Sequence, residues 1–336
     1  MENLLKFEGI SLVFMKKIKV KFIDNCPGLD PIFLDILQDK YDVELSNSPD
    51  YLFCSVFGNK HFLYDDCIKI FYTGENITPN FNLYDYALGF DYITYGSRYL
   101  RLPLWRFACE FRDDFLPRSS IEMSEKQILE RKFCNFVYSN GKSKKRIEFF
   151  HILNNYRHID SGGKFMNNIG TNGVESKLDF QRNYKFSIAF ENTEFDGYTT
   201  EKIIDAYKAR SIPIYWGNPK IAEELNPDSF INCYDYDSLD SVAKKVADLD
   251  KSDDAYLKML KAPIFAPRSE TNMQIMKNLR GFIYNIIEKG TKYRKDRFYW
   301  YNEKYNKHLL RIRKIIFSKS KGSSTKRDVH TYESDT

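Results

Sequence analysis

The apolar and polar positions of one stretch change period twice and so predict a strand, a loop, a helix and a second strand. The apolar run Phe186–Phe190 predicts a short buried strand, and Glu191–Gly197 forms a polar loop that ends in glycine. One of two adjacent threonines can then cap a helix that runs to Arg210, and Ile212–Trp216 resumes an apolar strand. A unit of this kind predicts a parallel sheet with a right-handed crossover.

Polar side chains crowd the loop and the start of the helix. They are Glu191, Asn192, Tyr198, Glu201 and Lys202. In open α/β sheets, ligands bind beyond the carboxyl ends of the strands, where this loop lies. The free N–H groups of a first helical turn favour phosphate, Lys202 adds a cation, and Glu201 can accept hydrogen bonds from sugar hydroxyls. The pattern alone predicts an anion-binding α/β domain. It leaves open that Glu201 only complements the helix dipole and that Lys202 is a solvated surface charge.

The first part of the chain has a similar pattern. Alternation of basic and apolar residues at Lys17–Asp24 and strand-like runs at Tyr51–Gly58 and Ile68–Thr73 predict further strands. Glu75 follows the third of these strands directly, after a glycine that opens the turn. A carboxylate in this position is well placed to face a cleft, although position alone would also allow it to cap a turn.

A change in pattern predicts the division of the chain into parts. The stretch Phe111–Lys132 is charged and interrupted, which places a domain boundary near it. Lys132–Ser139 predicts a fresh strand, and the helix after it begins with basic residues that include Arg146. We predict a first domain over residues 1–130, a second domain over 131–291 that ends in an apolar helix at 272–289, and a tail over 292–336.

Composition narrows the class of protein. The chain has 336 residues, of which 43% are hydrophobic and 29% charged, as in ordinary soluble globular proteins. Its six cysteines form no C-x-x-C pair and its five histidines are dispersed, which favours free thiols in a reducing compartment and argues against zinc. Charged residues interrupt the N-terminal apolar stretch, so we expect neither a signal peptide nor a membrane span.

The tail carries the net positive charge. From Lys292 to Arg327 there are 13 Lys and Arg against two acidic residues, and residues 292–336 sum to about +8, which leaves about −3 for the rest of the chain. Aromatic residues alternate with the basic ones, and Leu309–Phe317 is roughly amphipathic. This combination fits an interfacial helix on an anionic membrane, and a solvated disordered tail is the alternative.

Four segments of the chain resemble parts of one enzyme family. The segment FENTEFDGYTTEKIIDAYKARSIPIYWG (190–217) resembles the signature of the α1,3/4-fucosyltransferases, above all the bacterial members that build Lewis-type antigens. FYTGEN (71–76), followed by FNLYDYALGFD (81–91) and RYLRLPLW (98–105), resembles the acceptor-domain motif of the same family. The resemblance covers roughly residues 50–290. It implies an α/β fold with two Rossmann-like domains facing a cleft, the GT-B architecture. The first domain would take the acceptor and the second GDP-fucose.

The resemblance also implies roles for particular residues. Glu75 matches the family's general base, and Glu201 is the second residue that we expect in catalysis. The expected donor-binding residues are Arg146, which would clamp the diphosphate, together with Asn192, Tyr198, Glu201 and Lys202. An exposed surface charge is the alternative for Arg146. Asp91 is a candidate acceptor contact. Because Arg146, Lys202 and the helix dipole can neutralise the leaving GDP, we expect no obligatory metal.

The implied reaction moves L-fucose with inversion onto the N-acetylglucosamine of an N-acetyllactosamine-type glycan, such as a lipopolysaccharide O-antigen that is lipid-linked. We therefore expect a cytoplasmic enzyme that is peripheral on the inner face of the cytoplasmic membrane and binds no nucleic acid. The sequence leaves the α1,3 or α1,4 linkage, the natural acceptor and the oligomeric state open. The alternatives are a transferase with another nucleotide sugar, a non-catalytic sugar-nucleotide sensor, and a nucleic-acid-binding protein that uses the tail.

Overall fold

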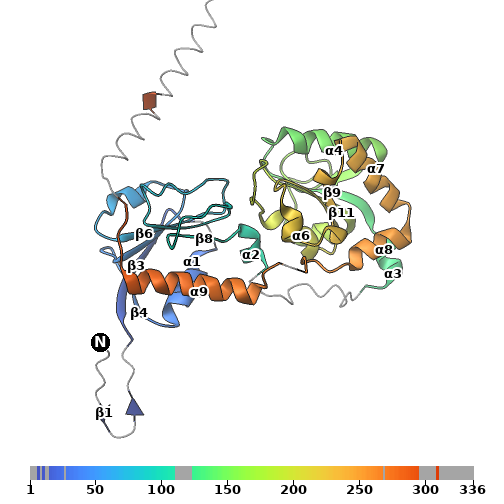
Figure 1. The fold of residues 1–336 in the computed structure, drawn as a ribbon. Coiled ribbons are helices and arrows are strands. Elements are labelled where there is room, and N and C mark those ends of the chain that lie inside the picture. Colours follow the sequence, from blue (N-terminus) through green and yellow to red (C-terminus); the bar gives the residue numbers. More distant parts are fainter. Residues whose placement is uncertain are drawn as a thin grey trace, which may run out of the picture.

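A computed structural model describes residues 15–25, 28–109, 123–267, 269–294 and 308–309, and the backbone of two short paired strands, β1 (Lys6–Phe7) and β2 (Ile10–Ser11). Most of the tail lies outside the described residues, including all of the amphipathic stretch predicted at 309–317 except its first residue, and so does Cys26. The described part folds into two α/β units, each built around its own parallel sheet (Figure 1).

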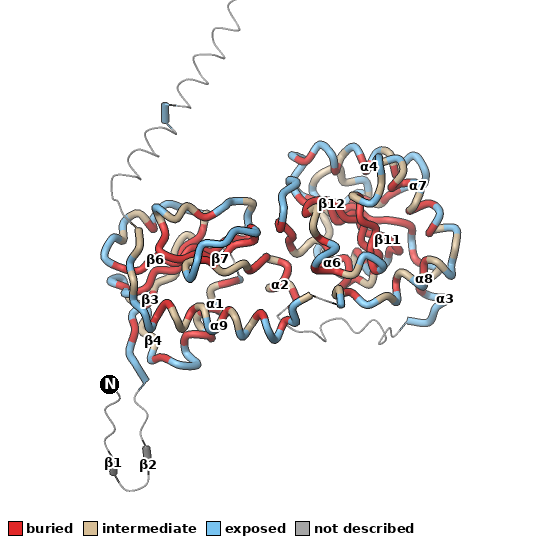
Figure 2. The backbone as a smooth tube through the Cα atoms, viewed as in Figure 1, coloured by how far each residue is buried: buried red, intermediate tan, exposed pale blue. Residues whose placement is uncertain are grey.

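The first sheet follows the early strands of the chain. Among the described residues its order is β4-β3-β5-β6-β7-β8, and every pairing is parallel. The strands are β3 (Lys17–Ile23), β4 (Asp42–Leu45), β5 (Tyr51–Cys54), β6 (Ile68–Tyr72), β7 (Tyr86–Gly89) and β8 (Tyr99–Arg101). β5 and β6 are buried along their whole length, because strands of a parallel sheet are covered on both faces (Figure 2). The helices α1 (Asp30–Gln38) and α2 (Leu104–Ala108) and a 3₁₀ turn at Lys60–Leu63 complete this part.

The second sheet has the order β10-β9-β11-β12-β13 in the described chain, again with parallel pairing. Its strands are β9 (Lys132–Phe136), β10 (Ile159–Ser161), β11 (Tyr184–Phe190), β12 (Ile212–Trp216) and β13 (Ile231–Asn232). The helices are α3 (Glu125–Leu129), α4 (Lys144–Tyr156), α5 (Lys177–Gln181), α6 (Glu201–Lys208), α7 (Leu239–Asp250) and α8 (Asp253–Lys261), with 3₁₀ turns at Ile221–Glu223, Pro227–Ser229 and Cys233–Asp235. The predicted α/β class with two Rossmann-like domains is confirmed, and β12 has the predicted bounds.

The last long helix, α9 (Asn272–Lys289), returns to the first sheet. The predicted second domain ran to residue 291, but Ile275, Leu279, Ile283 and Ile286 are buried in the core beneath the first sheet, where α9 also contacts α1 (Figure 1). The apolar stripe identified a helix that needs a covering surface. It did not identify which sheet supplies that surface.

The sequence also led us to expect free thiols and no membrane span. Cys54, Cys67, Cys109, Cys134 and Cys233 are free and buried. Within the described residues, no helix is both long enough and apolar enough to cross a bilayer.

Candidate active site

The loop between β11 and α6, residues 191–200, is organised by the carboxylate of Glu191. This side chain is fully buried, and it accepts hydrogen bonds from the Thr200 N–H at 2.8 Å, from the Thr200 hydroxyl at 2.8–2.9 Å and from the Lys202 ammonium at 2.9 Å. Of the two threonines offered as caps, Thr199 and Thr200, Thr200 occupies the N-cap position, but its hydroxyl bonds to Glu191 instead of capping the helix. The loop and the first turn of α6 are therefore held together by one side chain.

Burial acts in opposite directions on the two charged partners. It raises the pKa of Glu191 and, taken alone, would lower the pKa of Lys202. The carboxylates of Glu191 and Glu201 reverse the effect on Lys202, whose pKa is raised overall. The raised pKa of Lys202 is the direction that the geometry supports, because a carboxylate with this many donors is stabilised in its ionised form. The two groups form a buried ion pair.

Gly217 is required by the same carboxylate. A Cβ at this position would lie 2.3 Å from Cγ of Glu191, closer than side-chain atoms approach one another, and the residue has φ +154°. The glycine that ends the IPIYWG motif therefore leaves the space into which Glu191 folds.

Glu201 and Lys202 are the first two residues of α6, and their side chains differ in exposure to solvent. The Glu201 side chain is 44% exposed, and its carboxylate lies 3.6 Å from the Lys202 ammonium. Partial burial acts to raise the pKa of Glu201, but the Lys202 charge and a backbone hydrogen bond outweigh it, so this pKa is lowered. Glu201 thus presents an ionised acceptor to solvent, while Lys202 is largely buried.

Arg146 lies in the first turn of α4 and is only 1% exposed, so it is not a surface helix charge. Its guanidinium carbon sits 3.8 Å from the centre of the Tyr138 ring, and Nη2 donates to the Phe190 carbonyl at 2.9 Å and to Asn192 Oδ1 at 2.8 Å. Its Nε has no hydrogen-bond partner among the described residues. The structure brings Arg146 and Asn192 together, although 46 positions separate them.

The loop after β6 meets the 191–200 loop from the other domain. Glu75 is exposed, and its N–H donates to the Thr73 hydroxyl at 3.0 Å. The next residue, Asn76, donates through Nδ2 to the Thr193 hydroxyl at 2.6 Å. Burial is the main cause that raises the pKa of Tyr198, and the negative charges of Glu191 and Glu75 add to it.

Asp91 is buried, with 2% exposure. Its Oδ1 accepts from the Thr78 hydroxyl at 2.8 Å, while Oδ2 has no hydrogen-bond partner within the described chain, and burial raises its pKa. Thr78 belongs to the loop that carries Glu75. Asp91 therefore braces that loop, and its acceptor contact stays a prediction.

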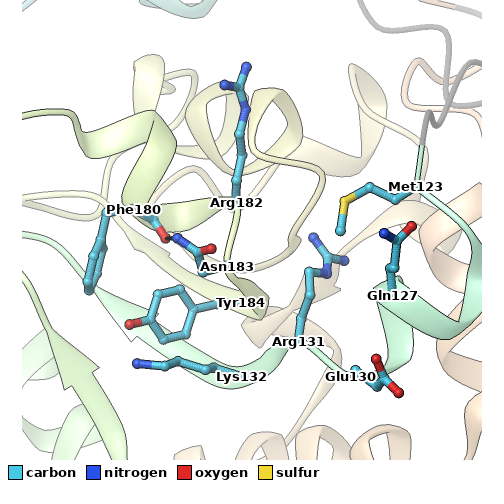
Figure 3. A pocket seen from close by; sticks show the side chains of 9 residues that line it. All are labelled: Met123, Gln127, Glu130, Arg131, Lys132, Phe180, Arg182, Asn183 and Tyr184. Atoms are coloured by element: carbon cyan, nitrogen blue, oxygen red, sulfur yellow. Dashed lines mark hydrogen bonds between the residues drawn. The ribbon is translucent and has the colours of Figure 1, made fainter.

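The pocket of about 430 Å³ shown in Figure 3 lies elsewhere, at the amino ends of β9 and β11. Its cations do not converge: Lys132 pairs with Asp160 at 2.8 Å, and Arg182 extends away from Arg131. Arg131 itself donates to the Arg210 carbonyl and the Tyr256 hydroxyl. The charged side chains of this pocket are therefore engaged in contacts within the protein.

No cluster of three or more His, Cys, Asp or Glu suited to a metal ion occurs in the described part of the chain. Both cations of the site contact the 191–200 loop, Arg146 through Asn192 and Lys202 through Glu191. The sequence pattern grouped Glu191 with the other polar residues but did not single it out. The only related feature in the sequence is the glycine that ends the IPIYWG motif, Gly217, and its contact with Glu191 is visible only in the structure.

Two family models match the chain. The N-terminal domain of alpha-(1,3)-fucosyltransferase FucT matches residues 20–108, and the C-terminal model of glycosyltransferase family 10 (fucosyltransferase) matches residues 125–277. Together they cover both sheets.

Individual proteins show the same similarity. Alpha-(1,3)-fucosyltransferase FucT of Helicobacter pylori is 36% identical over 260 residues, which is 67% of this chain and 54% of that protein. The putative fucosyltransferase R654 of Acanthamoeba polyphaga mimivirus is 28% identical over 60% of this chain and 34% of its own length. This chain thus spans about half or less of these relatives. A crystal structure of an alpha1,3-fucosyltransferase with GDP-fucose superposes with a TM-score of 0.70 at 30% identity, over 87% of this chain and 96% of that one.

Proposed function

The chain belongs to the fucosyltransferases of glycosyltransferase family 10, and from this premise we propose that it transfers L-fucose from GDP-β-L-fucose to the N-acetylglucosamine of an N-acetyllactosamine-type glycan in an α1,3 linkage. The observation that carries the proposal is the Asn76–Thr193 hydrogen bond of 2.6 Å. It joins the loop of the first domain that bears Glu75 to the loop of the second domain that bears the donor-binding candidates.

The proposed reaction is a single displacement with inversion. The acceptor hydroxyl attacks the anomeric carbon of fucose, and its proton passes to the carboxylate of Glu75. The new oxygen–carbon bond forms as the bond from that carbon to the β-phosphate oxygen breaks, and GDP leaves with the electron pair. Glu75 suits the role of base because it is exposed, beyond the end of a strand, at the seam between the domains. A positioned base contributes about 10²–10⁴-fold in rate.

The leaving diphosphate needs positive charge. Arg146 offers a planar fork, and Lys202 offers an ammonium at the start of α6, where free N–H groups favour phosphate. Asn192 orients Arg146, and Glu201 is an ionised acceptor for sugar or ribose hydroxyls. Tyr198, mostly buried beside Phe90, packs at the seam, where fucose would lie. These groups supply the charge stabilisation, and we propose that transfer needs no metal.

We also propose where the enzyme acts. The basic aromatic tail would hold it on the inner face of the cytoplasmic membrane of a bacterium, next to a lipid-linked acceptor of lipopolysaccharide biosynthesis. The support is the composition of residues 292–336, with its net charge of about +8.

A transfer assay tests the proposal. The protein is incubated with GDP-fucose and N-acetyllactosamine, with and without EDTA, and the product linkage is read by NMR. GDP-mannose and UDP-galactose serve as alternative donors. An α1,3-fucosylated product that survives EDTA is expected. Transfer from another donor at the higher rate would overturn the donor assignment, and loss of transfer with EDTA would overturn the metal-independent mechanism.

A further inference from the structure

One buried carboxylate of the second domain receives three hydrogen bonds from the first. Glu224 follows the 3₁₀ turn Ile221–Glu223 and is 6% exposed. Its Oε1 accepts from Arg101 Nη2 at 2.6 Å and from the Tyr92 hydroxyl at 2.9 Å, and its Oε2 accepts from Trp105 Nε1 at 2.7 Å. The three donors come from β8, from the loop before it and from α2, which lies between the two sheets (Figure 1).

The cluster continues into the proposed active site. Arg101 Nε donates to the Phe90 carbonyl at 2.9 Å, and the Phe90 ring packs edge-on against Tyr198, with centroids 5.2 Å apart. Gly197 has φ +84°, and a Cβ there would lie 2.4 Å from the Phe90 carbonyl oxygen. The backbone N–H of Trp105 donates to the Thr199 carbonyl at 3.3 Å. A chain of contacts therefore runs from Glu224 to the 191–200 loop.

The three hydrogen bonds to the Glu224 carboxylate restrict the orientation of the two domains relative to each other. Both of its oxygens are engaged by directional donors from three separate positions of the first domain, so a small rotation of one domain against the other would stretch all three bonds. Leaving a buried carboxylate without donors is costly, and charge-assisted hydrogen bonds are strong ones. The arrangement resists rotation at the seam where the loop that carries Glu75 contacts the 191–200 loop through Asn76 and Thr193.

We propose that Glu224 is a positioning residue for the transfer reaction. It holds the two domains in the orientation that places Glu75 against the sugar bound at the 191–200 loop. The proposal rests on the proposed function. It assigns no contact between Glu224 and substrate: the donor-binding candidates all belong to the second domain, so loss of Glu224 should slow transfer without weakening GDP-fucose binding.

Three variants remove the bonds. Glu224→Gln turns one accepting oxygen into a donor that faces donors, and Tyr92→Phe removes one hydroxyl, and both keep the shape of the side chain. Trp105→Phe removes the indole N–H together with part of the buried ring. Glu288→Gln is the matched control, since Glu288 accepts from the Tyr41 hydroxyl at 2.9 Å within the first domain alone. Each variant is assayed for kcat and for GDP-fucose affinity. The distance between spin labels on cysteines placed at Ser48 and Lys244, exposed positions of the two domains, is measured in parallel.

We expect kcat of Glu224→Gln to fall about tenfold to a hundredfold, because small misplacements of reacting groups cost that much. GDP-fucose affinity should change less than about twofold, and the label distances should broaden. Glu288→Gln should match the wild type. An unchanged kcat and distance distribution, or a fall in affinity as large as the fall in kcat, would overturn the proposal. If Glu224→Gln does not fold, Tyr92→Phe, which removes a single hydroxyl, decides. If the wild type transfers no fucose, the proposed function fails, and the distance distribution alone decides whether Glu224 sets the domain orientation.

Discussion

The Lys202 ammonium lies 2.9 Å from the carboxylate of Glu191, and the two side chains are almost wholly withdrawn from solvent. Both residues belong to the segment between β11 and the first turn of α6. Their contact fixes the direction in which the cation points, because the carboxylate also bonds to Thr200 at the end of the loop. The cation proposed to meet the diphosphate is thus held in place before the donor binds.

Replacing Glu191 by Gln should destabilise the protein and weaken donor binding together. Removing one partner of a buried ion pair costs about 3–5 kcal/mol, since the other charge is left uncompensated. Chemical denaturation and calorimetric titration with GDP-fucose measure the two effects. Asp205→Asn is the control: Asp205 lies on α6 and pairs with Lys177 near the surface, where such pairs contribute below about 1 kcal/mol. Equal losses in the two variants would contradict the role given to Glu191.

Replacing Glu75 by Gln should lower kcat by about 10²–10⁴-fold and leave GDP-fucose affinity nearly unchanged, because the side chain acts on the acceptor proton. Initial rates and donor titration are the measurements. Glu130→Gln, at an exposed carboxylate of the second domain away from the seam, should have wild-type rates. A large loss of donor affinity in the Glu75 variant would show that this residue binds the donor instead.

Replacing Gly197 by Ala should push the two domains apart. The new Cβ would meet the Phe90 carbonyl oxygen at 2.4 Å, and inserting atoms into a packed site costs about 1–3 kcal/mol. Gly290→Ala is a matched control, because Gly290 also has a positive φ, +56°, but no atom lies within 4 Å of the new Cβ. Melting temperature and kcat should fall more in the Gly197 variant. Similar values would mean that backbone strain alone matters at both positions.

Deleting residues 295–336 should leave transfer to a soluble acceptor intact and reduce binding to vesicles that contain phosphatidylserine. The cut keeps Tyr293 and Arg294, whose N–H groups donate to the buried Asp85 carboxylate at 2.7 and 2.9 Å. Each basic residue near an anionic surface contributes roughly 1 kcal/mol of attraction. Co-sedimentation with anionic and neutral vesicles measures the binding.

Replacing Arg311, Arg313 and Lys314 by Gln keeps the length of the tail and should weaken only the binding to anionic vesicles. If the truncated and full-length proteins bind these vesicles equally, the tail is not the membrane anchor.

Local pattern was enough to predict several elements. The strand and helix at β11 and α6 and the strand β12 follow from short apolar runs and a change of period, which depend on residues next to one another in the chain. The predicted ends of two elements were wrong, because the end of an element depends on residues that are not its neighbours in the chain. The strand predicted at 51–58 ends at Cys54, and the helix predicted to reach Arg210 ends at Lys208. Helix and strand ends depend on contacts that periodicity does not report.

The candidate site residues were identified mainly by motif resemblance, and the structure adds their environment. Position alone allowed Arg146 to be a surface charge, but tertiary packing buries it against Tyr138 and Asn192. Asp91 was a candidate acceptor contact, yet its carboxylate lies in the interior. Glu224 drew no attention in the sequence, since a glutamate beside Glu223 in a short mixed stretch carries no pattern.

The apolar runs of the sequence by themselves predicted a parallel α/β unit at residues 186–216, further strands in the first part of the chain and the loops that carry polar groups, and motif resemblance added the two Rossmann-like domains. Only the tertiary structure decided that α9 covers the first sheet, that Glu191 and Lys202 form a buried pair, and that Glu224 joins the domains. Periodicity specifies that an apolar face must be covered, and the cost of burying a charge requires that a buried charge be paired. The partner is chosen by three-dimensional packing between residues far apart in the chain, as with Arg101 and Glu224.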